Sequence, residues 1–161
     1  MIVNLDKFSR KELVHKKIIF VVGYFDVLQP SHVRFLTQCK KQGDLLVVGM
    51  YSDKYIGSFG PGMKSAVNRQ EYRAEMLDSL ACVDMVTLID GPDCSKAIRA
   101  IYPQAFCKSD RWKAMDVPEI SLLRKIRCPV LFLPVAKEHT LMTLMARMSK
   151  AVTRGPIEED L

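Results

Sequence analysis

A glycine, an aspartate and a histidine follow one another closely at the end of an apolar run. Gly23, Asp26 and His32 fall in the stretch Gly-Tyr-Phe-Asp-Val-Leu-Gln-Pro-Ser-His. Glycine lets a backbone approach a phosphate closely, and a helix N-terminus directs free N–H groups and a positive dipole end at an anion. His32, in the first turn of the expected helix, can donate to the same anion. Taken alone, however, the stretch is better explained as a plain strand-to-helix connection capped by Ser31.

Alternating strands and helices must position these residues. Continuous apolar runs, typical of strands buried on both faces of a parallel sheet, lie at 17–23, 45–50, 84–89, 105–107 and 129–134. Helical patterns lie at 4–17, 30–42, 68–81, 95–102, 119–126 and 140–152. This order predicts an α/β fold: a Rossmann-like, doubly wound parallel sheet of about five strands with helices on both faces. Ligands bind such sheets beyond the carboxyl ends of the strands, where residues 23–32 are expected.

Length and composition indicate one globular domain. The chain has 161 residues, of which 48% are hydrophobic and 26% charged, and no linker or repeat divides it. We expect a single domain over 1–153 and a loose acidic tail over 154–161. No apolar run reaches the ~18 residues of a membrane span, and residues 1–7 lack the layout of a secretory signal. These features predict a cytoplasmic protein without a membrane partner.

Charge and cysteine content narrow the expected partners. The formal net charge of +6 suits phosphate-bearing ligands. Nucleic acid is an unlikely partner, because no helix carries a basic stripe and no aromatic residues alternate with basic ones. The five cysteines include no CxxC pair, so free and mostly buried thiols are expected, with neither a disulfide framework nor a zinc site.

The stretch from Gly23 onward resembles the signature of the cytidylyltransferase-like nucleotidyltransferases, GxFDxxHxGHxxxL. The likeness covers roughly residues 5–150 and is greatest to the heptose-1-phosphate adenylyltransferase domain and glycerol-3-phosphate cytidylyltransferase. Further segments match the family in order and spacing: Gly43-Asp44, Ser52-Asp53, Arg73-Ala74-Glu75, Asp84, and residues 108–112, which resemble a KGxDY or GDDW segment. The resemblance implies the nucleotidyltransferase fold and, as in related folds, a homodimer.

The resemblance also implies which residues form a site. The two histidines of HxGH fall at Gln29 and His32, which are therefore the catalytic candidates. The candidates for binding nucleotide or phosphate are Gly23, Tyr24, Phe25, Asp26, Ser31, Arg73, Asp110, Trp112 and Thr140. For Asp26 and Trp112, a turn aspartate and a packing tryptophan are the alternative explanations. Members of the family transfer a nucleotide to a substrate phosphate, usually with magnesium, so magnesium is the expected cofactor if the protein is active. No metal ligands are predicted in the chain itself.

Several groups that hold phosphates in the family are replaced. Gln29 can donate a hydrogen bond but cannot carry charge, and Ser31 stands where the family has glycine. Other replaced positions are Phe59 for a lysine, Val135 for an arginine, and Leu141 and Met142 for two hydroxyls. Possible substitutes nearby are Lys54, Lys64, Lys137 and His139. Positioning and charge neutralisation supply most of the rate in such transfers, so each lost donor costs ~3 kcal/mol.

Three functions remain open. The preferred one is a pseudoenzyme that binds a nucleoside triphosphate or a phosphorylated small molecule, with transferase activity weakened or lost. The alternative is an active nucleotidyltransferase that joins CMP or AMP to a sugar or polyol phosphate and releases pyrophosphate. The third is a scaffold or interaction subunit, which would use Met142, Met145 and Met148 as an adaptable surface. Their helical spacing, however, is more typical of a core-facing helix.

Overall fold

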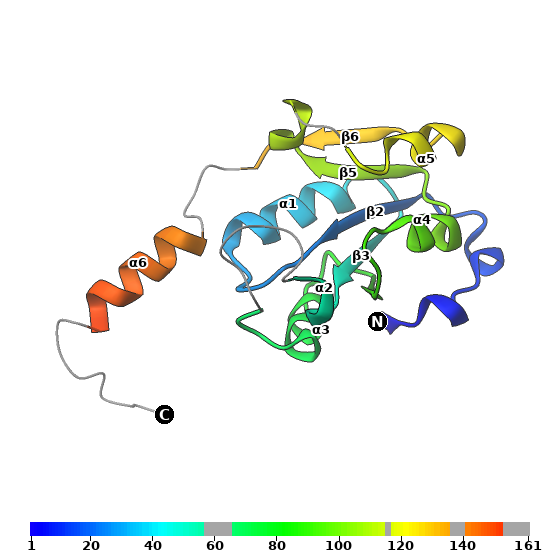
Figure 1. The fold of residues 1–161 in the computed structure, drawn as a ribbon. Coiled ribbons are helices and arrows are strands. Elements are labelled where there is room, and N and C mark those ends of the chain that lie inside the picture. The colour runs from blue at the N-terminus through cyan, green and yellow to red at the C-terminus, as the bar shows by residue number, and fades with distance from the viewer. Residues whose placement is uncertain (57–65, 115–116, 136–140, 153–161) are drawn as a thin grey trace.

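One parallel sheet organises the chain. The computed structural model describes residues 1–56, 66–114, 117–135 and 141–152 (Figure 1). The strands are β1 (Ile2–Val3), β2 (Ile18–Gly23), β3 (Leu45–Tyr51), β4 (Met85–Ile89), β5 (Ala105–Ser109) and β6 (Val130–Leu133). They are arranged in the order β1-β4-β3-β2-β5-β6, and every pairing is parallel. The carboxyl ends of the strands therefore meet at one edge of the sheet, as the doubly wound fold requires.

Helices cover both faces of the sheet. The helices of the described residues are α1 (Pro30–Lys40), α2 (Asp53–Ile56), α3 (Gln70–Asp78), α4 (Ser95–Ile101), α5 (Ile120–Lys125) and α6 (Leu141–Val152), with the 3-10 turns η1 (Leu5–Lys7), η2 (Arg10–Leu13) and η3 (Asp110–Ala114). Phe35 and Leu36 of α1 and Leu77 of α3 join one buried apolar cluster. Ile98 of α4 and Leu123 of α5 join the other. The two clusters lie on opposite faces because successive side chains of each strand point to opposite sides.

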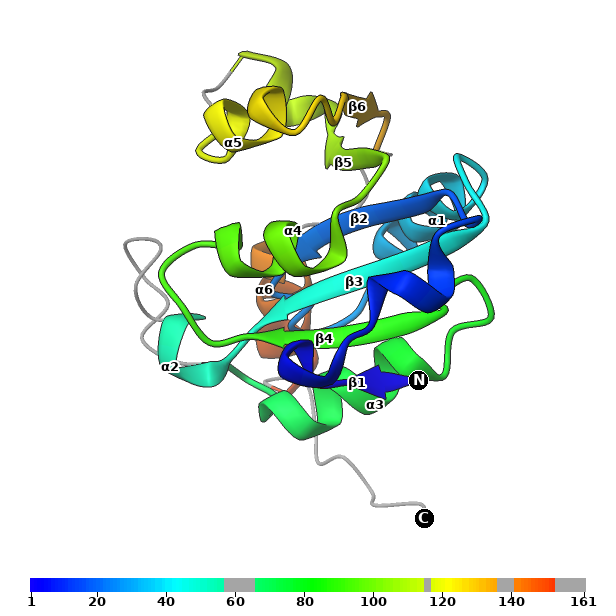
Figure 2. The ribbon, with the colours of Figure 1, turned by 90° about the vertical axis from the view of Figure 1, so that its right-hand side faces the viewer.

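The strand prediction is confirmed with one addition. The five predicted strands are present, and their alternate side chains fill the two clusters. The sixth strand, β1, is only two residues long and pairs with β4 at the edge of the sheet (Figure 2). A strand of two residues leaves no pattern in a sequence, which explains why it was not predicted.

The helix predicted at 4–17 is wrong. The segment instead forms η1 and η2, and Phe8 between them is extended (φ −73°, ψ 121°). The side chain of Asn4 accepts a hydrogen bond from the N–H of Asp6, a local bond that competes with helix. The extended break lets Leu5, Phe8 and Leu13 all pack against the sheet. The spacing of the apolar residues thus reflects burial against the sheet, but the segment that carries them is not a helix.

The last helix does not use its methionines as predicted. Figure 1 shows α6 projecting from the body of the protein. Met145 and Met148 are 52% and 58% exposed, so their assignment to a core is wrong. Within the described ranges, no helix is both long and apolar enough to cross a membrane. All five cysteines are free thiols, as expected.

Candidate functional site

A cavity of about 350 Å³ lies at the carboxyl ends of β2 and β5. The chain runs from β2 outward to β3 and β4, then returns to the other side of β2 with β5, so the strand order reverses here. Such reversals are where open parallel sheets bind ligands. The walls come from β2, the turn into α1, β5 and η3. The lining residues are Val21, Val22, Gly23, Tyr24, Phe25, Asp26, Gln29, Ser31, His32, Phe35, Cys107, Lys108, Ser109, Arg111, Trp112 and Val135.

The turn that closes one side of the cavity is strained and firmly held. Phe25 and Val27 have left-handed φ values of 50° and 49°, which are costly for residues with a Cβ and most of all for a β-branched one. Between them, the Asp26 carboxylate accepts hydrogen bonds from the N–H groups of Val67 (2.6 Å) and Asn68 (3.0 Å). It also accepts from the Asn68 side-chain amide (3.2 Å) and the Val27 N–H (3.1 Å). Asp26 thus fixes the turn and joins it to the segment before α3.

Gly23 allows the Phe25 ring to fold over the end of β2. A Cβ atom at Gly23 would lie 2.9 Å from that ring, a contact that real Cβ atoms do not make. The Phe25 ring in turn meets the imidazole of His32 edge-on, with ring centroids 6.1 Å apart. The glycine of the motif therefore acts here through the aromatic wall of the cavity.

His32 stands in the first turn of α1 and contributes a neutral donor. The Gln29 backbone N–H donates to its Nδ1 (3.1 Å), while the His32 N–H donates back to the Gln29 carbonyl (2.9 Å). With Nδ1 accepting, the proton of the neutral ring sits on Nε2. Burial lowers the pKa of His32, and the positive charge of Arg111 lowers this pKa further. The side chain is therefore neutral at physiological pH and presents Nε2–H as a donor.

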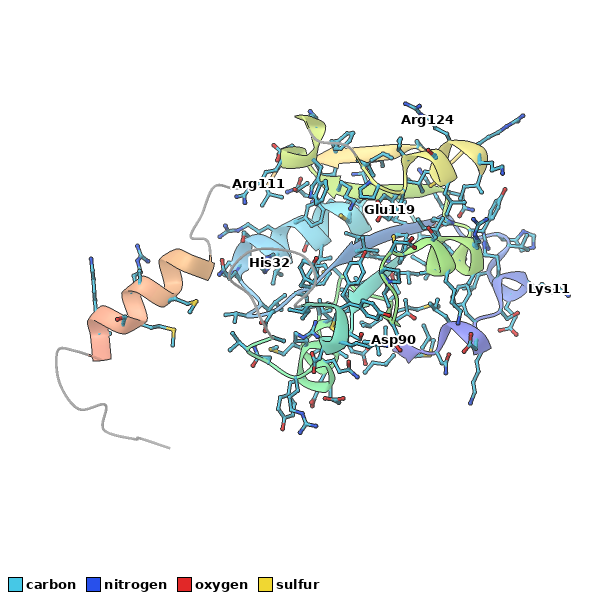
Figure 3. The ribbon with its side chains drawn as sticks, in the orientation of Figure 1. Lys11, His32, Asp90, Arg111, Glu119 and Arg124 are labelled. Carbon is cyan, nitrogen blue, oxygen red and sulfur yellow. The ribbon has the colours of Figure 1, made fainter. Side chains whose placement is uncertain are left out.

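Two cations reach the cavity from the other side. Lys108 is the fourth residue of β5, and Arg111 lies in η3. Figure 3 shows Arg111 and His32 at the same end of the sheet. The Lys108 ammonium lies 4.3 Å from the centroid of the Trp112 ring and 5.4 Å from that of Phe106, both distances typical of cation–π contacts. Neither cation was among the predicted site residues, although the resemblance to KGxDY includes both positions and Lys108 matches its lysine.

Arg73 is placed differently from the other predicted site residues. Its side chain is fully buried and does not line the cavity. The guanidinium donates to the carbonyls of Tyr24 (2.6 Å), Tyr51 (3.0 Å) and Asn68 (3.1 Å), and pairs with the Asp53 carboxylate (2.6 Å). One side chain thus connects the ends of β2 and β3 with α2 and α3.

The remaining candidates separate into three groups. Gly23, Tyr24, Phe25, Asp26, Gln29, Ser31, His32 and Trp112 line the cavity together. Asp110, the first residue of η3, is not among the lining residues. Thr140 lies outside the described residues, as do the replaced position Phe59 and the possible substitutes Lys64, Lys137 and His139.

The described residues do not fit a resident magnesium site. Among them, no three His, Cys, Asp or Glu side chains are grouped so that they could hold a metal ion. Asp26 is the one carboxylate among the described residues that line the cavity, and both of its oxygens already accept hydrogen bonds from N–H donors. Magnesium is usually bound through carboxylates together with substrate phosphates. No step of a reaction is therefore assigned to a metal held by this chain.

Curated relatives share much of this sequence. The bifunctional protein HldE of Campylobacter fetus is 32% identical over 126 residues, which is 78% of this chain and 27% of that protein. HldE of Wolinella succinogenes is 34% identical over 112 residues, 70% of this chain and 23% of that protein. The chain thus spans about a quarter of the length of these HldE proteins. The D-beta-D-heptose 1-phosphate adenylyltransferase of Bordetella bronchiseptica is 27% identical over 148 residues, covering 87% of this chain and 91% of its own.

Solved structures share the fold. A lipopolysaccharide core biosynthesis protein from Thermoplasma volcanium matches with a TM-score of 0.62 and 24% identity, covering 77% of this chain and 99% of its own. A pantoate-beta-alanine ligase from Francisella tularensis matches with a TM-score of 0.60 and 14% identity, covering all of this chain and 82% of its own. A model of the cytidylyltransferase-like family matches residues 20–147. The chain therefore belongs to the cytidylyltransferase-like family of nucleotidyltransferases.

Proposed function

We propose that this protein binds a nucleotide or another phosphorylated small molecule in the cavity between β2 and β5, with transferase activity weakened or lost. The observation that carries the proposal is the set of donors around the cavity. His32, Lys108 and Arg111 approach it from three different elements, α1, β5 and η3, and Trp112 and Tyr24 supply aromatic surface. Cationic donors recognise phosphate, and aromatic faces suit a base or a sugar. The net charge of +6 favours the same class of ligand.

The proposal of weakened nucleotidyl transfer rests on family residues that are replaced around the cavity. The family's first histidine is Gln29, whose side chain carries no charge, and the glycine between the histidines is the buried Ser31. Val135, at the position of the family's arginine, also lines the cavity and supplies only apolar surface. Removing one positioned donor costs about a hundredfold in rate. The changes at Gln29 and Val135 therefore leave binding possible while removing much of the stabilisation of the transition state.

Calorimetric titration with ATP and with CTP, each with magnesium, tests the binding. We expect one of the two to bind, and His32→Ala to weaken that binding about tenfold, as loss of one hydrogen bond to a charged group implies. His15→Ala is the matched control, because His15 is exposed and lies away from the cavity. If neither ATP nor CTP binds at millimolar concentration, the proposal is contradicted.

An active nucleotidyltransferase is the second candidate, favoured by the likeness to an adenylyltransferase and by Lys108 and Arg111 in the cavity. Pyrophosphate release distinguishes the two, with ATP or CTP and either a heptose 1-phosphate or glycerol 3-phosphate as acceptor. We expect turnover well below the ~1 s⁻¹ at the low end of typical enzymes. Faster release that disappears in His32→Ala but not in His15→Ala would establish the active enzyme instead.

A further inference from the structure

A buried cluster of ionisable groups lies behind the cavity. The Lys108 side chain is 9% exposed and the Glu119 side chain 4% exposed, and their Nζ and Oε2 atoms are 3.7 Å apart. Glu119 directly precedes α5, and Figure 3 shows it inside the fold, whereas Arg124 of α5 points outward. Only Lys108 of this pair lines the cavity. The ammonium thus stands between an internal carboxylate and the space for a ligand.

The two oxygens of Glu119 are held differently. The buried thiol of Cys94 donates to Oε1 at 3.2 Å. Burial raises the pKa of Cys94, and the nearby Glu119 carboxylate raises it further, so the thiol keeps its proton. Oε2 is buried and accepts no hydrogen bond from the residues that the structure describes, because 3.7 Å from the Lys108 ammonium is too long for one. Buried polar atoms without a partner are rare, and each one calls for an explanation.

Lys108 is held by more than its ion pair. The Trp112 and Phe106 rings lie 4.3 and 5.4 Å from the ammonium. Trp112 also lines the cavity, so this contact draws the ammonium toward the ligand side. The ammonium is therefore shared between a carboxylate that it does not fully engage and an aromatic face beside the cavity.

We infer that Lys108 is the cation that holds a phosphate group of the ligand, and that Glu119 is an internal counter-anion from which the ligand takes over the ammonium. This inference deepens the proposed function and rests on it. Lys108 is a binding residue, whereas Glu119 acts through it as a positioning residue. No bond is made or broken in the exchange: an ion pair at 3.7 Å gives way to a direct contact between ammonium and phosphate.

The inference predicts opposite effects for the two partners. Removing the ammonium removes attraction for an anion, whereas removing the carboxylate removes a competitor for the same ammonium and a negative charge near the ligand. A purely structural ion pair would instead be disrupted by either change, because each leaves an uncompensated buried charge. The direction of the Glu119 effect therefore decides between the two roles.

The experiment measures binding of magnesium-ATP, magnesium-CTP and inorganic pyrophosphate to the full chain by calorimetry. We expect Lys108→Gln to weaken the observed binding at least tenfold and Glu119→Gln to strengthen it about threefold to tenfold. Lys113→Gln is the matched control, since Lys113 is an exposed lysine of η3, the turn that follows β5, and it should change binding less than twofold. Circular dichroism and thermal unfolding confirm that each variant is folded before titration.

Each other outcome has a definite meaning. If both Lys108→Gln and Glu119→Gln weaken binding, or if Lys108→Gln leaves it unchanged, the inference is overturned while the proposed function stands. If the wild-type protein binds none of the three probes, the proposed function fails and the inference with it. Should Lys108→Gln not fold, the NMR signal of the Lys108 side-chain nitrogen in the wild-type protein decides. It should shift on addition of pyrophosphate, and a signal that does not respond contradicts the inference.

Discussion

Arg73→Met should destabilise the protein by about 4 kcal/mol. Methionine fills a similar space but donates no hydrogen bond, so three carbonyls each lose the hydrogen bond that Arg73 donates. An unsatisfied buried acceptor costs ~1–3 kcal/mol. The Tyr51 carbonyl is buried and is assigned about 2 kcal/mol, whereas the partly buried carbonyls of Tyr24 and Asn68 can regain some water and are assigned about 1 kcal/mol each. The Asp53 side chain is 41% exposed, so losing its ion pair adds little.

Urea unfolding followed by circular dichroism measures this loss. The midpoint should fall while the slope of the free energy of unfolding against urea stays constant. In a chain of this size the melting temperature should fall by roughly 8–16 °C. Arg73→Lys keeps the charge but not the forked donors, so about half of the loss is expected to remain. Arg69→Met is the matched control, because that side chain is 76% exposed, and it should stay within about 0.5 kcal/mol of wild type.

A loss of less than about 1 kcal/mol for Arg73→Met would refute this reasoning. The resemblance to the nucleotidyltransferases implies a phosphate-binding role for Arg73. That role would appear as weaker nucleotide binding in a variant as stable as wild type. The two measurements together therefore separate a side chain that holds the turns in place from one that contacts the ligand.

Three further predictions concern the cavity and the assembly. The pKa of His32 should lie below 6.5 by NMR titration and should rise in Arg111→Gln. As the pH falls, the His32 imidazole is protonated in the unfolded chain at a higher pH than in the folded protein. The contribution of His32 to stability is therefore present above pH ~6.5 and is lost as the pH falls toward the folded-state pKa. Gly23→Ala should displace the Phe25 ring and weaken nucleotide binding severalfold in calorimetry, since its Cβ would lie 2.9 Å from that ring; unchanged affinity would contradict this. Light scattering should give twice the 18.3 kDa chain mass if the implied homodimer forms, and the monomer mass would exclude it.

The fold was predictable where burial leaves a clear pattern. Continuous apolar runs identified the strands that are covered on both faces, because such strands consist mostly of apolar residues. The helix predicted at 4–17 was wrong because the spacing of apolar residues alone does not distinguish a helix from short turns that bury the same side chains. The core-facing prediction for Met145 and Met148 was wrong because the exposure of these side chains depends on whether another surface covers α6, which local sequence does not encode.

The site was predictable where residues adjoin one another in the chain. Most residues from Gly23 to His32 line one wall together because a single turn carries them. Lys108 was not predicted because its position at the cavity is set by contacts with Glu119 and Trp112, and the contact with Glu119 forms only in the folded protein. Arg73 matched a family position, but its acceptors lie on three separate segments, so its burial could not be inferred from spacing.

The pairing of β2 with both β3 and β5 has a consequence for the order in which the molecule assembles. Ile19 pairs with Leu46, a nearby residue in the sequence, but on its other side it pairs with the far more distant Ala105. Closing a longer loop costs more chain entropy, and distant pairings form more slowly. We expect the β2–β3–β4 half of the sheet to form before β5 docks. The cavity, which needs β2 and β5 side by side, should then be among the last features to appear during folding.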